Sequence, residues 1–331
     1  MINLKKVHGS QNSFFILDQT LLTTPLTEQE LVTLTKTLTT KATGILGGAD
    51  GILVVQKSST PNTVAQMRVI NADGSEASMC GNGLRTVARY LAEKHALTSF
   101  KVQTRQSDLE VQKQAAELAP NVPAFGVEIS PVHFEKRYLP FDNLGAEQII
   151  DRPLVEFEPQ KKLHFTIMAV PNPHLISFVP DIEKAGTFLG ELGAKLNTLN
   201  PYFPDGVNVN FAQILGPNKL FVRTYERGVG FTNACGTGMS ATSLAFYLSH
   251  PEQCDLTQEI TVFNPGGMVK TKVRQLDDQF KIQLIGNATF THDILVAESH
   301  LHHNTVTPDV CQIQATGEQE AYLKFIQHLN A

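Results

Sequence analysis

The sequence has no apolar run long enough to cross a bilayer, and its first residues lack the apolar core and cleavage site of a secretory signal. We therefore expect a cytoplasmic protein without a membrane partner. Basic clusters are also missing, and the net charge of −5 argues against nucleic acid as a partner. Cysteine is scarce, and the wide spacing of the four thiols fits neither a disulfide framework nor a C-x-x-C metal site. In the cytoplasm all four would be reduced.

The common catalytic signatures are absent as well. The chain has no G-x-x-x-x-G-K-[ST] loop, no G-x-S-x-G elbow and no H-E-x-x-H pair. The glycines of residues 44–51 do not follow G-x-G-x-x-G, so no nucleotide cofactor is predicted. His300, His302 and His303 have no carboxylate or cysteine at ligand spacing, and we interpret them as a solvated polar turn. We therefore predict neither a cofactor nor a metal.

The overall composition is that of an ordinary globular protein. Apolar residues make up 42% of the chain and charged residues 18%, which is enough apolar material for a full core. A length of 331 residues makes two domains the natural expectation. Proline and glycine cluster at residues 119–131, which predicts a boundary between two halves of the chain.

Two short segments, one in each half, resemble one another. Cys80 opens the run CGNGLRTVARYL, and Cys235 opens CGTGMSATSLAFYL. Each run places a cysteine and two glycines directly before apolar residues at helical spacing, so we predict a helix beginning at each cysteine. Strand-like segments precede both motifs, at residues 53–55, 67–70, 211–215 and 220–225. The repeat predicts an α+β protein with an internal duplication, in which the strands of each half wrap around one central helix.

Other segments fit the same fold class. Thr27 and Glu30 make a capping box before Leu31, Leu34 and Leu38, whose apolar spacing predicts a helix. Two further stretches, residues 183–196 and 318–329, also have the pattern of helices. The mixture of helices and short strands is typical of α+β proteins.

A cysteine at a helix N-terminus has distinctive chemistry. Its sulfur faces free backbone N–H groups and the positive end of the helix dipole, and both favour the thiolate over the thiol. The adjacent glycines allow a ligand carboxylate to approach those N–H groups closely. Two such cysteines suit the inversion of an α-carbon without a cofactor, because this reaction needs a base on one face and an acid on the other. The carbanion would be stabilised through its hydrogen-bonded carboxylate.

Several polar residues accompany the two cysteines. Each alone has an ordinary structural interpretation, as a turn residue, a satisfied histidine or a surface ion pair. Together they supply amides, a carboxylate and a guanidinium, which a small zwitterion with more than one carboxylate would need. They are Asn71, Asn172, His174, Asn208, Glu226 and Arg227.

These motifs resemble those of the diaminopimelate epimerase family, pyridoxal-independent isomerases of lysine and peptidoglycan precursor synthesis. The similarity runs from VHGSQNSFFILD through RVINADGSEASMCGNGLRTVARY and VPNPHLI to YERGVGFTNACGTG, and reaches about residue 293. It implies two pseudo-symmetric domains, each a strongly curved mixed sheet or barrel around a central helix, that close over substrate. The implied boundaries are 1–125 with a returning segment of about 285–331, and 126–284.

The resemblance also implies roles for individual residues. Cys80 and Cys235 would be the acid and base on opposite faces of the substrate, which is LL-2,6-diaminopimelate. His174 and Glu226 would tune or orient them. Substrate contacts would come from the backbone amides of Gly81, Asn82, Gly236 and Thr237 and from the side chains of Asn12, Asp50, Asn71, Asn172, Asn208, Glu226 and Arg227.

Some positions depart from the family pattern. Phe231 stands where a carboxylate is usual, Gln11 replaces a glycine, and Asp50 lies where the family often has glutamine. His292 occupies the position of a tyrosine used in dimer contact, which weakens the prediction of a homodimer that the resemblance supports. Residues 294–331 extend beyond the usual end and receive no role from the family.

Two alternatives stay open on the sequence alone. One is a two-cysteine racemase of another amino acid such as histidine, for which Phe231 is the main argument. The other is a silent relative that only binds an amino acid, which would require one cysteine to be missing or displaced. The retained Asn71, Asn208 and Arg227 favour diaminopimelate, because a site for a simple amino acid would leave these polar groups unpaired.

Overall fold

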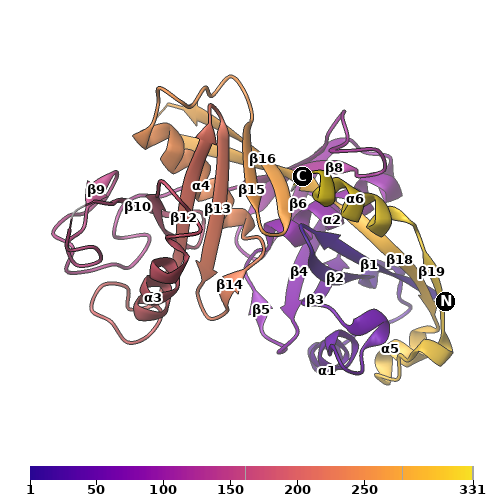
Figure 1. Ribbon diagram of the computed structural model, residues 1–331. Coiled ribbons are helices and arrows are strands. Elements are labelled where there is room, and N and C mark those ends of the chain that lie inside the picture. Colours follow the sequence, from indigo (N-terminus) through magenta and orange to yellow (C-terminus); the bar gives the residue numbers. More distant parts are fainter. Residues whose placement is uncertain (161, 278, 330–331) are drawn as a thin grey trace. The chain divides into compact units, whose positions relative to one another are not determined.

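A computed structural model describes residues 1–160, 162–277 and 279–329. The chain divides into two compact units, the first formed by residues 1–127 and 286–331 and the second by residues 128–285. Each unit has its own mixed sheet and its own helix that begins at a motif cysteine (Figure 1). The predicted α+β class is confirmed.

The first unit is built on nine strands in the order β19-β18-β1-β2-β3-β4-β6-β7-β8, with the short β5 paired to β4. The pairs β2–β3 and β4–β6 are parallel and the others antiparallel. The strands are β1 (Ile2–Gly9), β2 (Asn12–Asp18), β3 (Gly51–Gln56), β4 (Ala65–Asn71), β5 (Glu76–Ala77), β6 (Ser99–Gln103), β7 (Asp108–Lys113), β8 (Ala124–Ile129), β18 (Thr289–Val296) and β19 (Cys311–Ala315). The helices are α1 (Glu28–Thr39), α2 (Gly81–His95), α5 (Glu298–His302) and α6 (Glu318–Leu329).

Helix α2 is the central helix of this unit and contacts β1, β2, β3, β4 and β7. Its residues from Gly81 to Ala92 are all buried, which is typical of a helix enclosed by strands. Helix α1 packs Leu31, Leu34 and Leu38 into a separate core with β3 and the C-terminal strands. The predicted capping box of Thr27 and Glu30 is present at its start.

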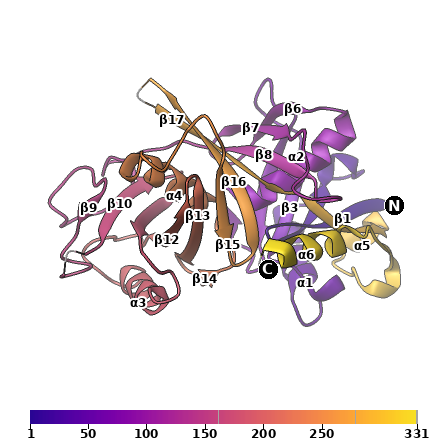
Figure 2. The same cartoon turned by 45° about the horizontal axis from the view of Figure 1, so that its top comes forward.

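The second unit has the strand order β9-β10-β11-β12-β13-β15-β16-β17, with β14 paired to β13. Again two pairs are parallel, β11–β12 and β13–β15. The strands are β9 (Arg152–Pro153), β10 (His164–Ala169), β11 (Pro173–Phe178), β12 (Asn208–Gly216), β13 (Lys219–Glu226), β14 (Gly230–Thr232), β15 (Ile260–Asn264), β16 (Gly267–Leu276) and β17 (Gln279–Asn287). The helices are α3 (Gly186–Leu196) and α4 (Gly236–Ser249), and both lie against β12 and β13 (Figure 2).

The two units repeat one topology. In each, a helix connects the first parallel strand pair, α1 between β2 and β3 and α3 between β11 and β12. In each, a short strand, β5 or β14, precedes the cysteine helix, which leads to the strand of the second parallel pair. This correspondence agrees with the internal duplication that the two cysteine motifs predict. All four predicted strands fall within β3, β4, β12 and β13.

Two local predictions need correction. The helix expected at residues 183–196 begins at Gly186, because the Asp181 carboxylate accepts the N–H groups of Glu183 and Lys184 and forms a turn first. His300 and His302 lie in α5 and not in a polar turn. Two carboxylates approach His302, since Glu30 Oε1 is 3.0 Å from its Nδ1 and Glu298 Oε1 is 3.8 Å from its Nε2. The prediction missed Glu30 because it is far away in sequence, and it missed Glu298 because a turn was expected in place of the helix that brings residues four positions apart together.

The C-terminal segment belongs to the first unit. Strand β19 pairs antiparallel with β18, and Ala315 of β19 lies opposite His292 of β18. Helix α6 packs against β18. Helix α5 lies beside α1 (Figure 1). Among the described residues, none of the helices combines the length and apolarity that crossing a membrane would require.

Candidate active site

Cys80 is the N-cap of α2. Its sulfur accepts a hydrogen bond from the Gly83 N–H at 3.4 Å, and its side chain is half-buried. The sulfur also lies 3.6 Å from Asn12 Oδ1, to which the thiol donates. Capping by sulfur holds Cys80 at the positive end of the helix dipole, where a thiolate is favoured.

Asn12 connects Cys80 to its surroundings. Its Oδ1 also accepts from Asn82 Nδ2 at 3.4 Å, and its Nδ2 donates to Asp50 Oδ2 at 2.8 Å. Asn12 follows a two-residue turn between β1 and β2 in which Ser10 and Gln11 have φ of 51° and 66°. Gln11 therefore occupies a left-handed position that a glycine would adopt without strain.

Asn71 lies at the end of β4, opposite Gly51 at the start of β3. The backbone N–H of the next residue, Ala72, donates to the Asp50 carbonyl at 3.0 Å, which brings Asn71 next to Asp50. A Cβ on Gly51 would lie 2.4 Å from the Ile70 carbonyl oxygen, so this close approach requires glycine. The structure therefore links Asn12 to Cys80, Asn82 and Asp50, and it places Asn71 next to Asp50, where the Asn71 Nδ2 donates to Ser75 Oγ at 3.0 Å.

Cys235 is the N-cap of α4 and is 6% exposed. Its sulfur accepts from the Gly238 N–H at 3.3 Å and lies 3.5 Å from Thr237 Oγ1. Gly236 and Thr237 are the first residues of α4, as Gly81 and Asn82 are of α2. At these positions an α-helix directs its N–H groups to acceptors outside the helix. A carboxylate is the acceptor that suits them best.

Glu226, the last residue of β13, contacts Cys235. Burial raises the pKa of its carboxyl group, and hydrogen bonds with Thr232 and Cys235 partly offset this effect. The Thr232 hydroxyl donates to Glu226 Oε1 at 2.5 Å. A carboxyl group with a raised pKa beside a thiol can exchange a proton with it, which is the property expected of a tuning residue.

His174 is fully buried and bonds through both ring nitrogens. Its Nδ1 is 3.1 Å from Asn210 Nδ2, and its Nε2 is 3.2 Å from Asn172 Oδ1. Asn210 Oδ1 already accepts from the Thr224 hydroxyl at 2.9 Å, so its Nδ2 must donate to His174 Nδ1. The histidine proton therefore lies on Nε2 and is donated to Asn172. Burial and the nearby Arg227 charge lower the pKa of His174 to about 3.

These contacts give His174 a structural part near Cys235. A neutral histidine fixes the amide of Asn172, and Asn210 continues the chain of contacts toward the sulfur. A Cβ on Gly238 would lie 2.3 Å from Asn210 Oδ1 and 3.2 Å from Cys235 Sγ, so both groups border the Gly238 position. Asn208 supports Arg227, because its Oδ1 accepts the Arg227 N–H at 2.8 Å.

Comparisons with known proteins assign the chain to a family. The sequence model of the diaminopimelate epimerase family matches residues 4–122 and 166–291. A diaminopimelate epimerase of Ligilactobacillus salivarius is 51% identical over 99% of this chain and 100% of that protein. One of Enterococcus faecalis is 48% identical over 99% of each chain.

The chain belongs to the diaminopimelate epimerase family. Both relatives are named diaminopimelate epimerases, and epimerases are isomerases. Solved structures show the fold alone, because their identities are low. A Bacillus anthracis protein of the PhzF family has a TM-score of 0.60 at 15% identity, covering 87% of this chain and 96% of that chain. A hydroxyproline epimerase from Agrobacterium vitis has a TM-score of 0.52 at 14% identity, covering 87% and 89%.

The C-terminal segment is shared with close relatives of the epimerase family. The family model ends its match at residue 291, whereas the alignment with the Ligilactobacillus salivarius epimerase covers 99% of this chain. Residues 294–331 therefore lie almost entirely within the aligned length. The epimerases of Ligilactobacillus salivarius and Enterococcus faecalis therefore also carry the extension, so it is not peculiar to this chain.

Phe231 lies away from the Glu226 side of its hairpin. It pairs with Tyr225 on β13, and its ring packs against Tyr225, the Arg223 guanidinium and the Gly190 position of α3. The alternation of strand side chains puts Thr232, which contacts Glu226, on the other face. Phe231 therefore takes no part in the described contacts of Glu226.

Two residues with clear contacts were missed by the sequence reasoning. Asn210 lies two positions after Asn208 on β12, so the same strand face carries both amides. This spacing was a usable signal, since both residues belong to the run NVNF. Thr232 had no comparable signal, because its contact with Glu226 depends on the pairing of β13 with β14.

The buried neutral His174 predicts a pH dependence of stability. The unfolded chain binds a proton at this residue below its ordinary pKa of 6.5, whereas the folded chain does not until about 3. The free energy of unfolding should therefore fall as pH decreases from 7 to 5, with His174 contributing about 2 kcal/mol. Urea unfolding at several pH values would measure this slope.

The control for this measurement is His174→Gln, which has no titrating group at the position. Between pH 7 and pH 5 the free energy of unfolding of this variant should fall by about 2 kcal/mol less than that of the parent protein. This difference does not depend on the variant's stability at pH 7. The contribution of His8, whose pKa burial lowers to about 4, is common to both proteins. Equal slopes for the two proteins would show that His174 is not held neutral by the fold.

Proposed function

We propose that this chain converts LL-2,6-diaminopimelate into meso-diaminopimelate without a cofactor, in the synthesis of lysine and peptidoglycan precursors. Membership of the diaminopimelate epimerase family, with relatives at 48–51% identity over nearly the full length, supports the substrate. The observation that carries the mechanism is the repeated N-cap cysteine, whose sulfur accepts the N–H group three residues later in both units.

The reaction breaks one Cα–H bond and forms another on the opposite face. A thiolate removes the α-proton, and a neutral thiol gives its own proton to the carbanion, so the two sulfurs exchange protonation states in each turnover. Cys80 and Cys235 are the proposed pair. The negative charge that develops on the substrate carboxylate is stabilised by the N–H groups of Gly81, Asn82, Gly236 and Thr237.

The remaining residues bind and orient the substrate and the thiols. In the first unit Asn12 holds the Cys80 thiol, and Asp50 and Asn71 supply further polar groups. In the second unit Glu226 exchanges protons with Cys235, and His174 orients Asn172. Asn208 and Arg227 bind the distal carboxylate, for which a guanidinium is well suited.

Racemisation of another amino acid is supported less well. Its main argument is Phe231, and the ring of this residue packs against Arg223, Tyr225 and α3 on the face opposite Thr232. A silent binding protein would need a missing or displaced cysteine, whereas both cysteines cap their helices. We further propose a cytoplasmic location, because the mechanism requires reduced thiols and all four cysteines are free. The homodimer stays a prediction.

Incubation with LL-diaminopimelate in deuterium oxide, with no cofactor added, tests the proposal. The expected product is meso-diaminopimelate with one deuterium at the inverted carbon, because the thiol that donates exchanges its proton with the solvent. Histidine incubated in parallel should keep its configuration and its α-proton. Racemisation of histidine without turnover of diaminopimelate would favour the other racemase, and exchange in neither substrate would contradict both proposals.

A further inference from the structure

Arg85 is a fully buried guanidinium in the second turn of α2, the helix that Cys80 caps. It donates from Nε to the Asn287 carbonyl at 3.1 Å and from Nη2 to Ser10 Oγ at 3.2 Å. Its Nη1 is buried without a hydrogen-bond partner among the described residues. In the same part of the chain, the ion pairs of α2 belong to Arg89 and Lys94, and none includes Arg85.

Two glycines make room for this guanidinium. A Cβ on Gly9 would lie 2.9 Å from Arg85 Nη2 and 2.8 Å from the Asn82 carbonyl oxygen. A Cβ on Gly286 would lie 2.9 Å from both the Cζ and the Nε of Arg85. The guanidinium thus lies in a narrow slot that Gly9 and Gly286 border, and this slot extends to the first turn of α2 at Asn82. Its partner Ser10 belongs to the turn that carries Asn12, which contacts Cys80.

A buried cation without an anionic partner is costly, so the charges around Arg85 matter. Burial lowers the pKa of Arg85 to about 10, and the groups whose negative forms would stabilise its charge are Tyr322 and Cys80. Tyr322 is fully buried, and burial raises the pKa of its hydroxyl group well above the ordinary value. Tyr322 therefore stays neutral, so the Cys80 sulfur, when it is ionised, is the anion that interacts with the Arg85 charge.

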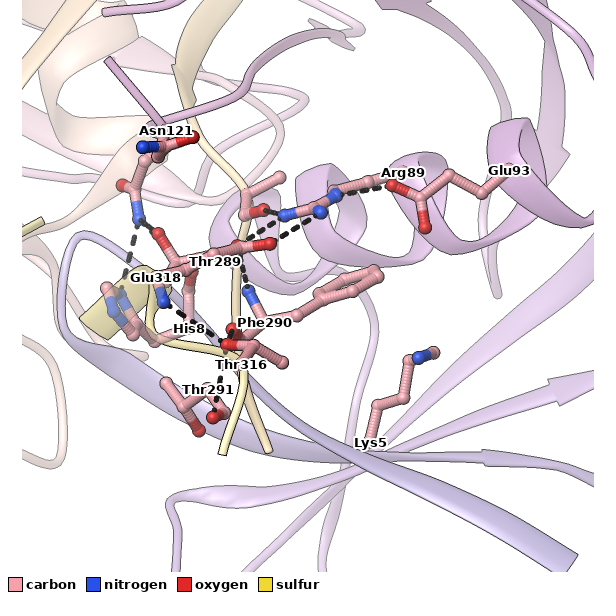
Figure 3. A network of polar contacts seen from close by, with 12 residues as sticks. Lys5, His8, Arg89, Glu93, Asn121, Thr289, Phe290, Thr291, Thr316 and Glu318 are labelled. Atoms are coloured by element: carbon pink, nitrogen blue, oxygen red, sulfur yellow. Dashed lines mark hydrogen bonds and ion pairs between the residues drawn. The ribbon is translucent and has the colours of Figure 1, made fainter. Parts of the chain in front are cut away.

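The C-terminal helix covers this slot. Tyr322 of α6 packs edge to face against His8 of β1, with ring centres 4.6 Å apart. Glu318, at the start of α6, accepts both arms of the Arg89 guanidinium and the Phe290 N–H, as Figure 3 shows. These bonds fix the helix on β18 and α2. Water is thereby excluded from Arg85, and the low polarity strengthens its interaction with other charges.

We propose that Arg85 is a positioning residue that holds Cys80 in its thiolate form, and that α6 keeps Arg85 out of water through Tyr322. The charge acts through space on the sulfur, and the Ser10 hydrogen bond fixes the turn that carries Asn12. This assigns a role to the C-terminal extension, which closes the unit behind the proposed base. The inference rests on the proposed function only in naming Cys80 as a base.

The other ionisable groups near Cys80 do not replace Arg85. The Asp50 carboxylate, bonded to Asn12, opposes a thiolate, and Lys6 on β1 lies close enough to Asp50 for the two charges to interact. His8 is uncharged above about pH 4, because burial lowers its pKa and the Arg85 charge lowers it further. Arg85 is thus the fixed positive charge behind the sulfur, on the helix that Cys80 itself caps.

The test is the pH dependence of alkylation of Cys80 by iodoacetamide, followed by peptide mass spectrometry in full-length Cys235→Ala protein. We expect Arg85→Met to move the midpoint up by about one pH unit and to slow alkylation at pH 7 about tenfold. Arg85→Lys keeps the charge and should remain within about threefold of the parent. Tyr322→Ala, which admits water, should shift the midpoint in the same direction by a smaller amount.

A matched control removes another charge of α2 together with its partner. Lys94→Met combined with Asp18→Asn, whose side chains form an ion pair of 2.6 Å, leaves the net charge of the unit unchanged and does not touch α6, so the Cys80 profile should not move. Cys254, whose thiol pKa burial raises to about 11, reports in each variant whether the protein has remained folded. If Arg85→Met does not fold, Arg85→Gln takes its place in the same comparison.

Three outcomes would overturn the inference. An unchanged profile in Arg85→Met would show that the guanidinium does not act on the sulfur. Equal shifts in Arg85→Met and Arg85→Lys would show that shape and not charge is required. An unchanged profile in Tyr322→Ala would remove the role of α6. The assay uses no substrate, so a normal epimerase with an insensitive profile contradicts only this inference, and an inactive protein with a sensitive profile contradicts only the proposed function.

Discussion

Alanine in place of Cys80 or of Cys235 is expected to lower the rate of epimerisation by about 10³-fold or more. In the proposed mechanism each thiol supplies either the base or the acid in one direction, and an alanine side chain at the helix N-cap has no group that could move a proton in its place. The fold should persist, because the Gly83 and Gly238 N–H groups that lose the sulfur lie in the first turn of their helices, where water can replace it. The measurement is the conversion of LL- into meso-diaminopimelate.

Cys254→Ala is the matched control for these two variants. Cys254 is a buried thiol of the same chain with a raised pKa, and it is not an N-cap of a helix. Its replacement should leave the rate within about twofold of the parent, since an inert buried cysteine has no part in catalysis. Retention of a tenth of the activity by either Cys80→Ala or Cys235→Ala would contradict the two-base assignment.

The single variants should also differ from one another in a way that identifies the faces. A chain with one thiol can still remove and return a proton on that face, so exchange with deuterium oxide can continue without inversion. Cys80→Ala and Cys235→Ala should therefore exchange the α-protons of opposite epimers. Exchange of the same epimer by both variants would show that the two thiols do not act on opposite faces.

The cysteine helices could be predicted because their signals are local. A cysteine, two glycines and an apolar 3.6-residue period determine where α2 and α4 begin, and the capping box at Thr27 does the same for α1. The strands before each motif were visible for the same reason. These features depend on residues a few positions apart, which a single sequence displays directly.

The contacts around His174 could not be predicted in this way. They depend on the parallel pairing of β11 with β12, which aligns His174 with Asn208 and brings Asn210 to the imidazole. The resemblance to a family implied that His174 tunes or orients the thiols, but it gave neither the tautomer nor the partner. Sequence periodicity alone gives no register between strands that are 30 or more residues apart.

The C-terminal segment shows the same limit more clearly. Residues 318–329 have a helical pattern, and α6 covers this range. What the pattern does not reveal is where the helix packs, because Glu318 meets Arg89 across 229 positions of sequence. Carboxylates in the first turn of a helix are usually interpreted as dipole partners, and here the carboxylate is an ion-pair partner as well.

Arg89→Met is expected to lower the free energy of unfolding by about 3 kcal/mol, because it leaves the Glu318 carboxylate partly buried without its cation. The side chains of Arg89 and Glu318 are only 10% and 18% exposed, and two hydrogen bonds of 2.6 and 2.7 Å join them (Figure 3). Burial lowers the pKa of Arg89, but the hydrogen bonds with Glu318 more than offset this and leave it raised. Urea unfolding at pH 7 would measure the loss.

The double variant Arg89→Met with Glu318→Gln separates the unpaired charge from the lost packing. A glutamine still accepts the Phe290 N–H that Glu318 accepts at 2.9 Å, and it is neutral. The double variant should therefore recover part of the loss. The other contacts of the Arg89 guanidinium stay lost, with the Ala288 carbonyl at 2.8 Å, the Glu93 carboxylate at 2.7 Å and the Phe290 ring at 4.0 Å from its centre. A double variant as unstable as Arg89→Met would show that the arginine stabilises the unit by packing, and that α6 is not held by this ion pair.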